Sequence, residues 1–193
     1  MRQALAGNPV PAAIFALTLV VWLVSEARQA LRQRSDAANS DRYSLTVVRL
    51  SVSAGVVLAA LAQRVSATAF AYSAVVFVIS LALLWAGIGL RWWCFRTLGR
   101  YFTFVVMTSG EQPVISTGPY AVVRHPSYAG MLLALCGLSL SFANWLSVVA
   151  LLVCALLGFI HRIHVEERAL TAALGPAYTS HAGTRRRLIP FVW

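Results

Sequence analysis

Two polar clusters in this sequence contain the residue types that bind charged ligands. The first cluster is the segment RHPSYAG at residues 124–130, and the second is HRIHVEE at residues 161–167. Arginine binds anionic groups and glutamate binds cationic ones, so the two clusters together could hold ligands of both signs. Between Arg124 and His161 the chain has no charged residue. The clusters therefore lie at the two ends of one long apolar segment.

This apolar segment is too long for a single membrane crossing and predicts a helical hairpin. We expect its arms at 128–140 and 145–160, with a turn at 141–144 that contains Asn144. The two outer ends of a hairpin lie on the same side of a membrane. The sequence therefore predicts that the two polar clusters meet at one membrane surface.

The composition indicates an integral membrane protein. The chain has 193 residues, of which 59% are hydrophobic and 11% charged, against about 45–50% and about 25% in soluble domains. So much apolar surface cannot be buried inside one small domain, and the excess must face lipid. The predicted fold class is all-α, because a helix satisfies its own backbone hydrogen bonds in lipid.

Apolar runs predict about five transmembrane helices in a single domain, 1–193. The expected spans are 10–24 (extending to residue 30 if the helix continues past Glu26), 45–62, 69–90 and the two hairpin arms. The last helix should continue to about Leu174, because Gly175-Pro176 is a strong stop signal. We divide the domain into a three-helix part, 1–97, and a cofactor-binding and catalytic part, 98–193.

The distribution of arginine predicts the orientation. The net charge of +10 comes from arginine alone, since the chain has no lysine. The segments 26–49, 91–124 and 162–187 contain 5, 4 and 5 arginines, whereas the opposite side has Arg2 and Arg64. The positive-inside rule places the rich segments, and both polar clusters, in the cytoplasm. Arginines beside apolar spans meet anionic lipid headgroups, so we expect membrane lipids as partners and no nucleic acid.

Several motifs together resemble the isoprenylcysteine carboxyl methyltransferase family. Phospholipid methyltransferases share parts of this pattern, and the resemblance covers about 98–190. The motifs are LGRYFT at 98–103, Gly118-Pro119-Tyr120, RHPSYAG at 124–130, Glu166-Glu167 with Leu170, Gly175 and Tyr178, and Leu188-Ile189-Pro190.

This resemblance implies a methyltransferase that uses S-adenosylmethionine, releases S-adenosylhomocysteine and needs no metal. It implies that Glu166 holds the ammonium end of the cofactor in a cytosol-facing pocket and that Arg162 faces the methyl acceptor, which makes these two the catalytic candidates. Two departures from the family pattern are His181 and the loop 110–117. The implied cofactor-binding residues are Gln112, Pro113, Val114, Ile115, Tyr120, His125, Pro126, Ser127, Tyr128 and Glu166.

The chemistry of the acceptor stays open at this point. A carboxylate, with a pKa near 4, is already ionised at pH 7 and needs no base. The resemblance implies, as the first hypothesis, methylation of the carboxylate of an isoprenylcysteine-like, isoprenoid or lipid molecule that enters from the bilayer. Methylation of a phospholipid amine is the alternative, and it would need a base such as His161, His164 or Glu167.

Two other classes of function have weaker support. His161 and His164 beside the glutamate pair could bind metal, but four histidines in the chain are few for a di-iron site. A membrane scaffold or a transporter subunit is the non-enzymatic alternative, although no predicted span has a charge at its centre. The absence of lysine and the abundance of Ala, Val and Arg indicate a GC-rich bacterial genome, and so a bacterial inner membrane.

Overall fold

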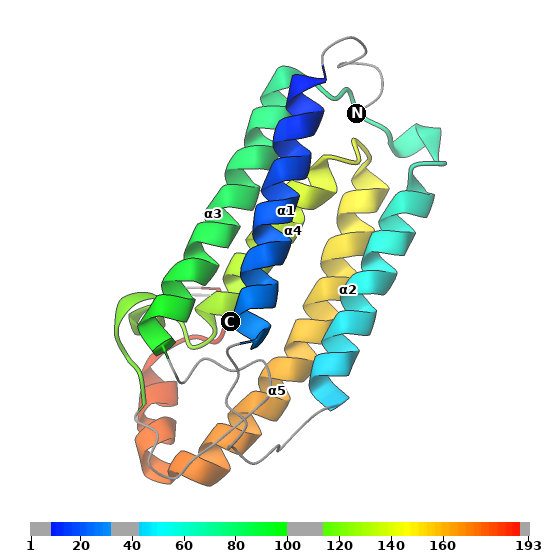
Figure 1. The fold of residues 1–193 in the computed structure, drawn as a ribbon. Coiled ribbons are helices and arrows are strands. Elements are labelled where there is room, and N and C mark those ends of the chain that lie inside the picture. Colours follow the sequence, from blue (N-terminus) through cyan, green and yellow to red (C-terminus); the bar gives the residue numbers. More distant parts are fainter. Residues whose placement is uncertain (1–8, 32–42, 100–113, 190–193) are drawn as a thin grey trace.

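The computed structural model describes residues 9–31, 43–99 and 114–189. Within these ranges five α-helices form the molecule, and no β-strand is present beyond two isolated bridges. The all-α prediction is confirmed. In chain order the elements are α1 (Val10–Leu31), α2 (Tyr43–Ala62), η1 (Ser66–Thr68), α3 (Ala74–Leu98), η3 (Gly118–Ala121), α4 (Pro126–Leu140) and α5 (Trp145–Thr184), as Figure 1 shows.

The predicted spans are confirmed for α1 and α2, and the bounds of α3 differ. This helix begins at Ala74 and continues to Leu98, whereas hydropathy places it at 69–90. The Ser73 side chain accepts a hydrogen bond of 3.3 Å from the Val76 amide and so caps the helix start. Gly99 ends it with a φ of 51°. Hydropathy shows only which residues are apolar enough to lie in lipid. A helix can continue past that stretch, because its ends depend on its backbone hydrogen bonds and caps.

Four helices, α1, α2, α3 and α5, are long and apolar enough to cross a membrane. The fifth, α4, has 15 residues and is about 22 Å long at 1.5 Å per residue, less than a hydrocarbon core of about 30 Å. Much of α4 is buried, including Gly130, Ala134, Leu135 and Gly137. The hairpin is therefore present, and its first arm is a short helix packed inside the bundle.

Glycines allow α3 and α4 to approach closely. A methyl group added at Gly137 would lie 2.5 Å from the Ser80 carbonyl oxygen and 2.6 Å from the Leu84 amide nitrogen. Both are backbone atoms of α3 and cannot move aside. Small residues at helix crossings are the usual means of close packing in membrane bundles. The rest of this core contains Phe15, Trp22, Leu84, Ile88, Ala134, Leu151 and Phe159.

We expect Gly137→Ala to lower the thermal unfolding temperature in detergent, because the new methyl group must separate α3 from α4. Overpacking of this kind costs about 1–3 kcal/mol. The matched control is Gly89→Ala on α3, where an added methyl group meets nothing within 4 Å. Alanine is the better helix former, so this control should stabilise the protein slightly. Equal melting temperatures for the two variants would contradict the packing argument.

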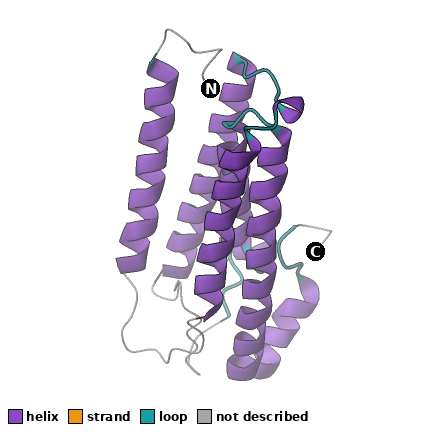
Figure 2. Cartoon of the chain, turned by 90° about the vertical axis from the view of Figure 1, so that its right-hand side faces the viewer, coloured by secondary structure: helices purple, strands orange, loops and turns teal. Residues whose placement is uncertain are grey.

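The helix α5 is 40 residues long and changes direction at Gly175, where φ is 52° and ψ is −129°. The predicted stop is therefore confirmed as a kink. A further helical segment to Thr184 follows it, which the sequence analysis did not predict. At 1.5 Å per residue, the path along α5 is about 60 Å, about twice the apolar thickness, so the helix continues beyond the apolar region. The charged residues between Arg162 and Arg168 favour the part after residue 160 as the portion outside it. Figure 1 shows the segment after the kink, coloured red, near the end of α3, and Figure 2 shows it folded back toward the bundle.

Candidate active site

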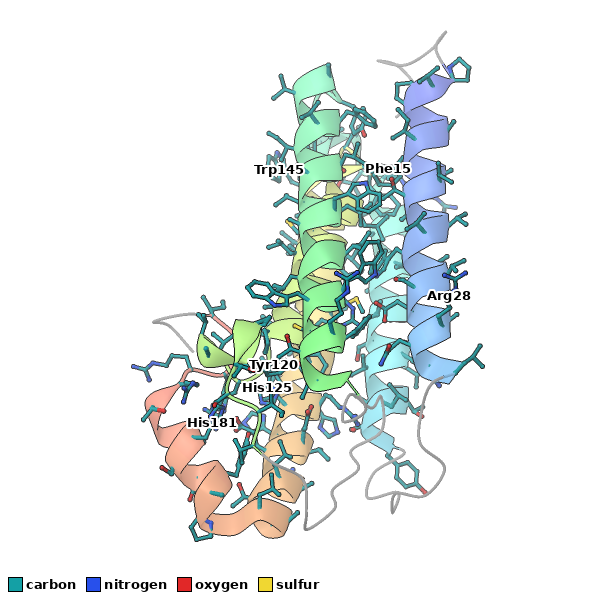
Figure 3. All side chains as sticks on the ribbon, turned by 60° about the vertical axis from the view of Figure 1, so that its left-hand side comes forward. Phe15, Arg28, Tyr120, His125, Trp145 and His181 are labelled. Atoms are coloured by element: carbon teal, nitrogen blue, oxygen red, sulfur yellow. The ribbon has the colours of Figure 1, made fainter. Side chains whose placement is uncertain are left out.

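The segment before α4 is fixed by backbone hydrogen bonds to the C-terminal residues. The amides of Arg124 and His125 donate to the carbonyls of Arg186 and Arg187, each at 2.8 Å. Leu188 next to them is 1% exposed. Pro126 then begins α4 at a position where a missing amide hydrogen does no harm. Arg186 and Arg187 thus hold His125 in place, and Figure 3 shows His125 in the same region of the molecule as Tyr120 and His181.

Tyr128 joins the two polar clusters. Its hydroxyl donates to Glu166 Oε2 at 2.8 Å and accepts from Arg162 Nε at 3.2 Å. Its ring stacks on Phe159 with a centroid distance of 5.4 Å. The predicted meeting of the clusters at one end of the hairpin is therefore confirmed. Arg162 and Glu166, four residues apart on α5, are connected through this hydroxyl.

Arg162 is held by three helices. Its side chain is on α5 and 3% exposed, and its Nη1 donates to the Ser44 hydroxyl on α2. With Tyr128 on α4 as the other partner, the guanidinium lies between α2, α4 and α5. The planar group of arginine keeps this orientation better than a lysine could. Ser44 was not among the predicted site residues, because nothing in the sequence relates it to a residue so distant along the chain.

The two adjacent glutamates have different surroundings. Glu167 lies 2.5 Å from Arg124 Nη1, 2.8 Å from Arg187 Nε and 3.4 Å from His125 Nε2. Burial opposes its ionisation, but the hydrogen bonds from His125 and Arg187 and the charge of Arg124 outweigh burial and lower the pKa of Glu167 to about 2. Its side chain is 11% exposed and that of Glu166 is 29% exposed. Glu166 is therefore the more accessible carboxylate.

The other predicted cofactor residues differ in their burial, and some lie outside the described ranges. Tyr120 on η3 is 8% exposed, and burial raises its pKa well above the ordinary value, so its phenol stays protonated at neutral pH. Ser127 is buried, while Val114 and Ile115 are half-buried. Gln112 and Pro113 lie outside the residues that the structure describes.

A basic cavity of about 320 Å³ opens beside the C-terminal segment. Arg124 and residues 182–187 line it. His181 is close to it, and burial together with the charge of Arg185 lowers the pKa of this histidine, so the ring is neutral at pH 7. Arg187 also contacts Glu167, and its role was missed from the sequence. The signal in the sequence was the run of three arginines at 185–187 downstream of the two glutamates, which could have indicated an ion pair.

The metal hypothesis has no support among the described residues, where no group of three or more His, Cys, Asp and Glu side chains could hold an ion. His161 and His164 are exposed. The His164 Nδ1 atom lies 2.7 Å from the Ile160 carbonyl oxygen of its own helix. Both histidines therefore lie on the exposed side of α5, whereas Arg162 is buried.

We expect Tyr128→Phe to weaken binding of the cofactor about tenfold, because the variant removes the hydroxyl that orients both Glu166 and Arg162. A buried group that loses its partner costs about 1–3 kcal/mol, while the stacking on Phe159 is kept. The control is Tyr43→Phe, at a side chain that is 85% exposed. Calorimetry with S-adenosylhomocysteine measures the effect, and equal affinity in both variants would show that the hydroxyl does not organise the site.

Comparison with known proteins identifies the same family as the motifs. The family model for isoprenylcysteine carboxyl methyltransferases matches residues 78–172. Protein-S-isoprenylcysteine O-methyltransferase B of Arabidopsis thaliana is 33% identical over 98 residues, which are 50% of each chain. The Saccharomyces cerevisiae protein-S-isoprenylcysteine O-methyltransferase is 32% identical over 99 residues, 50% of this chain and 41% of the yeast protein. The chain thus spans about half the length of the curated relatives it matches.

The fold agrees with a solved structure of a eukaryotic intramembrane Ras methyltransferase ICMT. The TM-score is 0.66 at 21% identity, covering 96% of this chain and 69% of the other. At this identity the likeness concerns the fold alone. The family match covers most of α3, the His125-Pro126 segment and α5 through Glu166-Glu167. The motifs, the family model and the curated relatives agree: residues 78–172 match the isoprenylcysteine carboxyl methyltransferase family.

Proposed function

We propose that this protein is an integral membrane methyltransferase that uses S-adenosylmethionine to methylate the carboxylate of a lipophilic acceptor. The observation that carries the proposal is the contact of Tyr128 with both Glu166 and Arg162 at one end of an apolar bundle. The names of the relatives support an isoprenylcysteine-like acceptor. Because the match covers half of those proteins, isoprenoid or lipid acids belong to the same proposal.

The residues present suit the proposed cofactor. Glu166 is a partly exposed carboxylate that can hold an ammonium group, and Tyr120 and Tyr128 offer aromatic surface beside it. The proposal also includes His125, Pro126 and Ser127, which are buried next to Tyr128, and apolar contacts from Val114 and Ile115 together with Gln112 and Pro113. When bound, S-adenosylmethionine supplies a methyl group on a positively charged sulfur, which an ionised carboxylate attacks without a base.

The protein's own contribution is then to orient the reactants and exclude water. Arg162 would attract the acceptor's carboxylate, but Tyr128 and Ser44 share its donors. This sharing prevents a full bidentate grip, which would lower the nucleophilicity of the oxygen. Alignment of two reactants in a site of this kind can lower a barrier by roughly 7–11 kcal/mol.

The acceptor and the cofactor would reach the site from different phases. Large apolar side chains cover the outside of the bundle, such as Leu17 at 65% and Leu23 at 66% exposed, so a lipophilic chain can approach from the bilayer. By the positive-inside rule, the arginines at the site end support a cytoplasmic location for that end, where the cofactor would be dissolved. A bacterial inner membrane remains part of this proposal.

Methylation of a phospholipid amine is the second candidate function, and it would require a base to remove a proton. Glu167 is a poor base, since its cationic partners lower its pKa to about 2. His161 and His164 are exposed on the outside of α5. The described residues therefore favour an acceptor that is already ionised.

The test incubates membranes containing the protein with methyl-labelled S-adenosylmethionine and separate prenylcysteine, isoprenoid acid, fatty acid and aminophospholipid acceptors. We expect label in a prenylcysteine or another lipophilic acid, released by mild base as an ester. Base-stable label in an aminophospholipid would support the alternative. Transfer to none of these acceptors, with no binding of S-adenosylmethionine by the purified protein, would contradict the proposed function.

A further inference from the structure

A buried arginine connects the N-terminal helix to the segment proposed to bind the cofactor. Arg91 on α3 is 3% exposed. Its Nε and Nη2 atoms donate to the two oxygens of Glu26 on α1, at 2.6 Å and 2.5 Å. Its Nη1 donates to the carbonyl and the hydroxyl of Ser127 on α4, at 3.1 Å and 2.9 Å. One guanidinium therefore holds a residue of α1 and a residue of α4 at the same time.

The geometry of this contact fixes orientation as well as distance. A bidentate arginine–carboxylate pair defines the plane of the guanidinium, and Glu26 thereby determines where Nη1 points. Ser127 lies in the first turn of α4, where the helix dipole is positive and repels a cation. Arg91 can stay there because the Glu26 carboxylate neutralises it. Removing Glu26 would thus leave a buried cation in an unfavourable field.

The position of Glu26 is unexpected for a residue that only stabilises the fold. In the most apolar part of α1, 17% of residues are buried, and the helix lies against α3 at the edge of the bundle, as Figure 3 shows. The family match begins at residue 78, so Glu26 lies outside it and Arg91 inside it. Through Arg91, a peripheral helix contacts the residue next to Tyr128.

We propose that Glu26 and Arg91 are positioning residues for the segment 125–128, and that α1 thereby sets the cofactor affinity of the site. The inference rests on the proposed function, because it assumes that this segment contacts the cofactor. Loss of the Glu26 carboxylate releases Nη1 from Ser127, and the first turn of α4 then shifts together with Tyr128. Cofactor binding weakens, while the affinity for the lipophilic acceptor changes little.

The experiment uses the full chain in detergent and compares Glu26→Gln with a charge exchange, Glu26→Arg combined with Arg91→Glu. The exchange restores an ion pair between α1 and α3 but gives Ser127 no guanidinium. Arg28→Gln, at an exposed residue of the same helix, is the control. The readouts are the melting temperature, the Kd for S-adenosylhomocysteine, and the KM values for cofactor and acceptor.

We expect Glu26→Gln to raise the Kd for S-adenosylhomocysteine and the KM for S-adenosylmethionine roughly tenfold, with a nearly constant acceptor KM. The exchange should recover the melting temperature but not the Kd. A purely structural tether predicts that both recover together, and that result would overturn the inference. Unchanged Kd in Glu26→Gln would overturn it as well.

Arg91→Lys keeps the inference testable if the exchange does not fold. This variant keeps a cation opposite Glu26 but replaces the fork that holds Glu26 and Ser127 together with a single ammonium group, so the Kd should rise while the melting temperature falls less than in Glu26→Gln. Wild-type Kd in this variant would count against positioning. If the wild-type protein does not bind S-adenosylhomocysteine at all, the proposed function is contradicted. Failure of the proposed function can thus be distinguished from failure of the positioning inference.

Discussion

Glu166→Gln is expected to weaken binding of S-adenosylmethionine by roughly ten- to a hundredfold and to reduce methyl transfer at least as much. Hydrogen bonds to a charged group contribute about 1.5–3 kcal/mol, and each 1.4 kcal/mol corresponds to about tenfold in affinity. Glutamine has nearly the same shape, and its carbonyl can still accept from the Tyr128 hydroxyl. The fold should therefore persist while the attraction for an ammonium group is lost. Calorimetry with S-adenosylhomocysteine measures the affinity directly.

The neighbouring residue provides a matched control for this prediction. Glu167→Gln removes the carboxylate that Arg124 and Arg187 contact, so the loss should appear as lower stability, roughly 2 kcal/mol. Some of the interaction is screened, because the Arg187 side chain is 32% exposed. Glu166→Gln should thus lower the affinity for the cofactor, whereas Glu167→Gln should lower the melting temperature. Wild-type affinity in Glu166→Gln would remove Glu166 from the cofactor site.

The meeting of Tyr128 and Glu166 could be predicted from the sequence because a hairpin has few geometric alternatives. An uncharged segment of this length must turn back, and its ends must then lie on one side. The different roles of Glu166 and Glu167 could not be predicted in this way. Successive residues on a helix point about 100° apart, and the sequence alone does not show which of the two faces Tyr128 and which faces Arg124.

Contacts between distant helices were also beyond the sequence. Arg91 and Glu26 each resemble ordinary charged residues at the end of a span, and nothing in their spacing indicates that they bind each other. The same holds for Ser44 and Arg162. Periodicity reports which face of a helix is buried, but the partner across the interface depends on which helices pack together, here α2 on α5 and α3 on α4.

These contacts explain how a site at the edge of a membrane can be rigid. Tyr128, Arg162 and Arg91 are all buried or half-buried. Each of the two arginines joins residues from two other helices, and Tyr128 joins α4 to α5. Buried polar side chains must find hydrogen-bond partners among themselves, so the orientation of one side chain restricts the orientations of its neighbours. Buried guanidiniums that keep fixed partners are therefore well suited to hold a ligand in one orientation.

Arg162→Gln is expected to lower kcat/KM for a carboxylate acceptor roughly a hundredfold, mainly through the acceptor KM. The guanidinium is the cation placed between Tyr128 and Ser44, and glutamine can accept or donate there without attracting an anion. Arg162→Lys should restore part of the activity, because it returns the charge without the planar fork. Assays with acceptor varied at saturating cofactor separate the two kinetic constants.

The affinity for S-adenosylhomocysteine decides what the loss in Arg162→Gln means. Because the Tyr128 hydroxyl can still donate to Glu166, this affinity should stay within about threefold of wild type. Ser44→Ala, which removes only one partner of the guanidinium, should give a smaller change in the same direction. If Arg162→Gln instead loses cofactor affinity and keeps its acceptor KM, Arg162 belongs to the cofactor's side of the site, and the acceptor's negative charge must be recognised elsewhere.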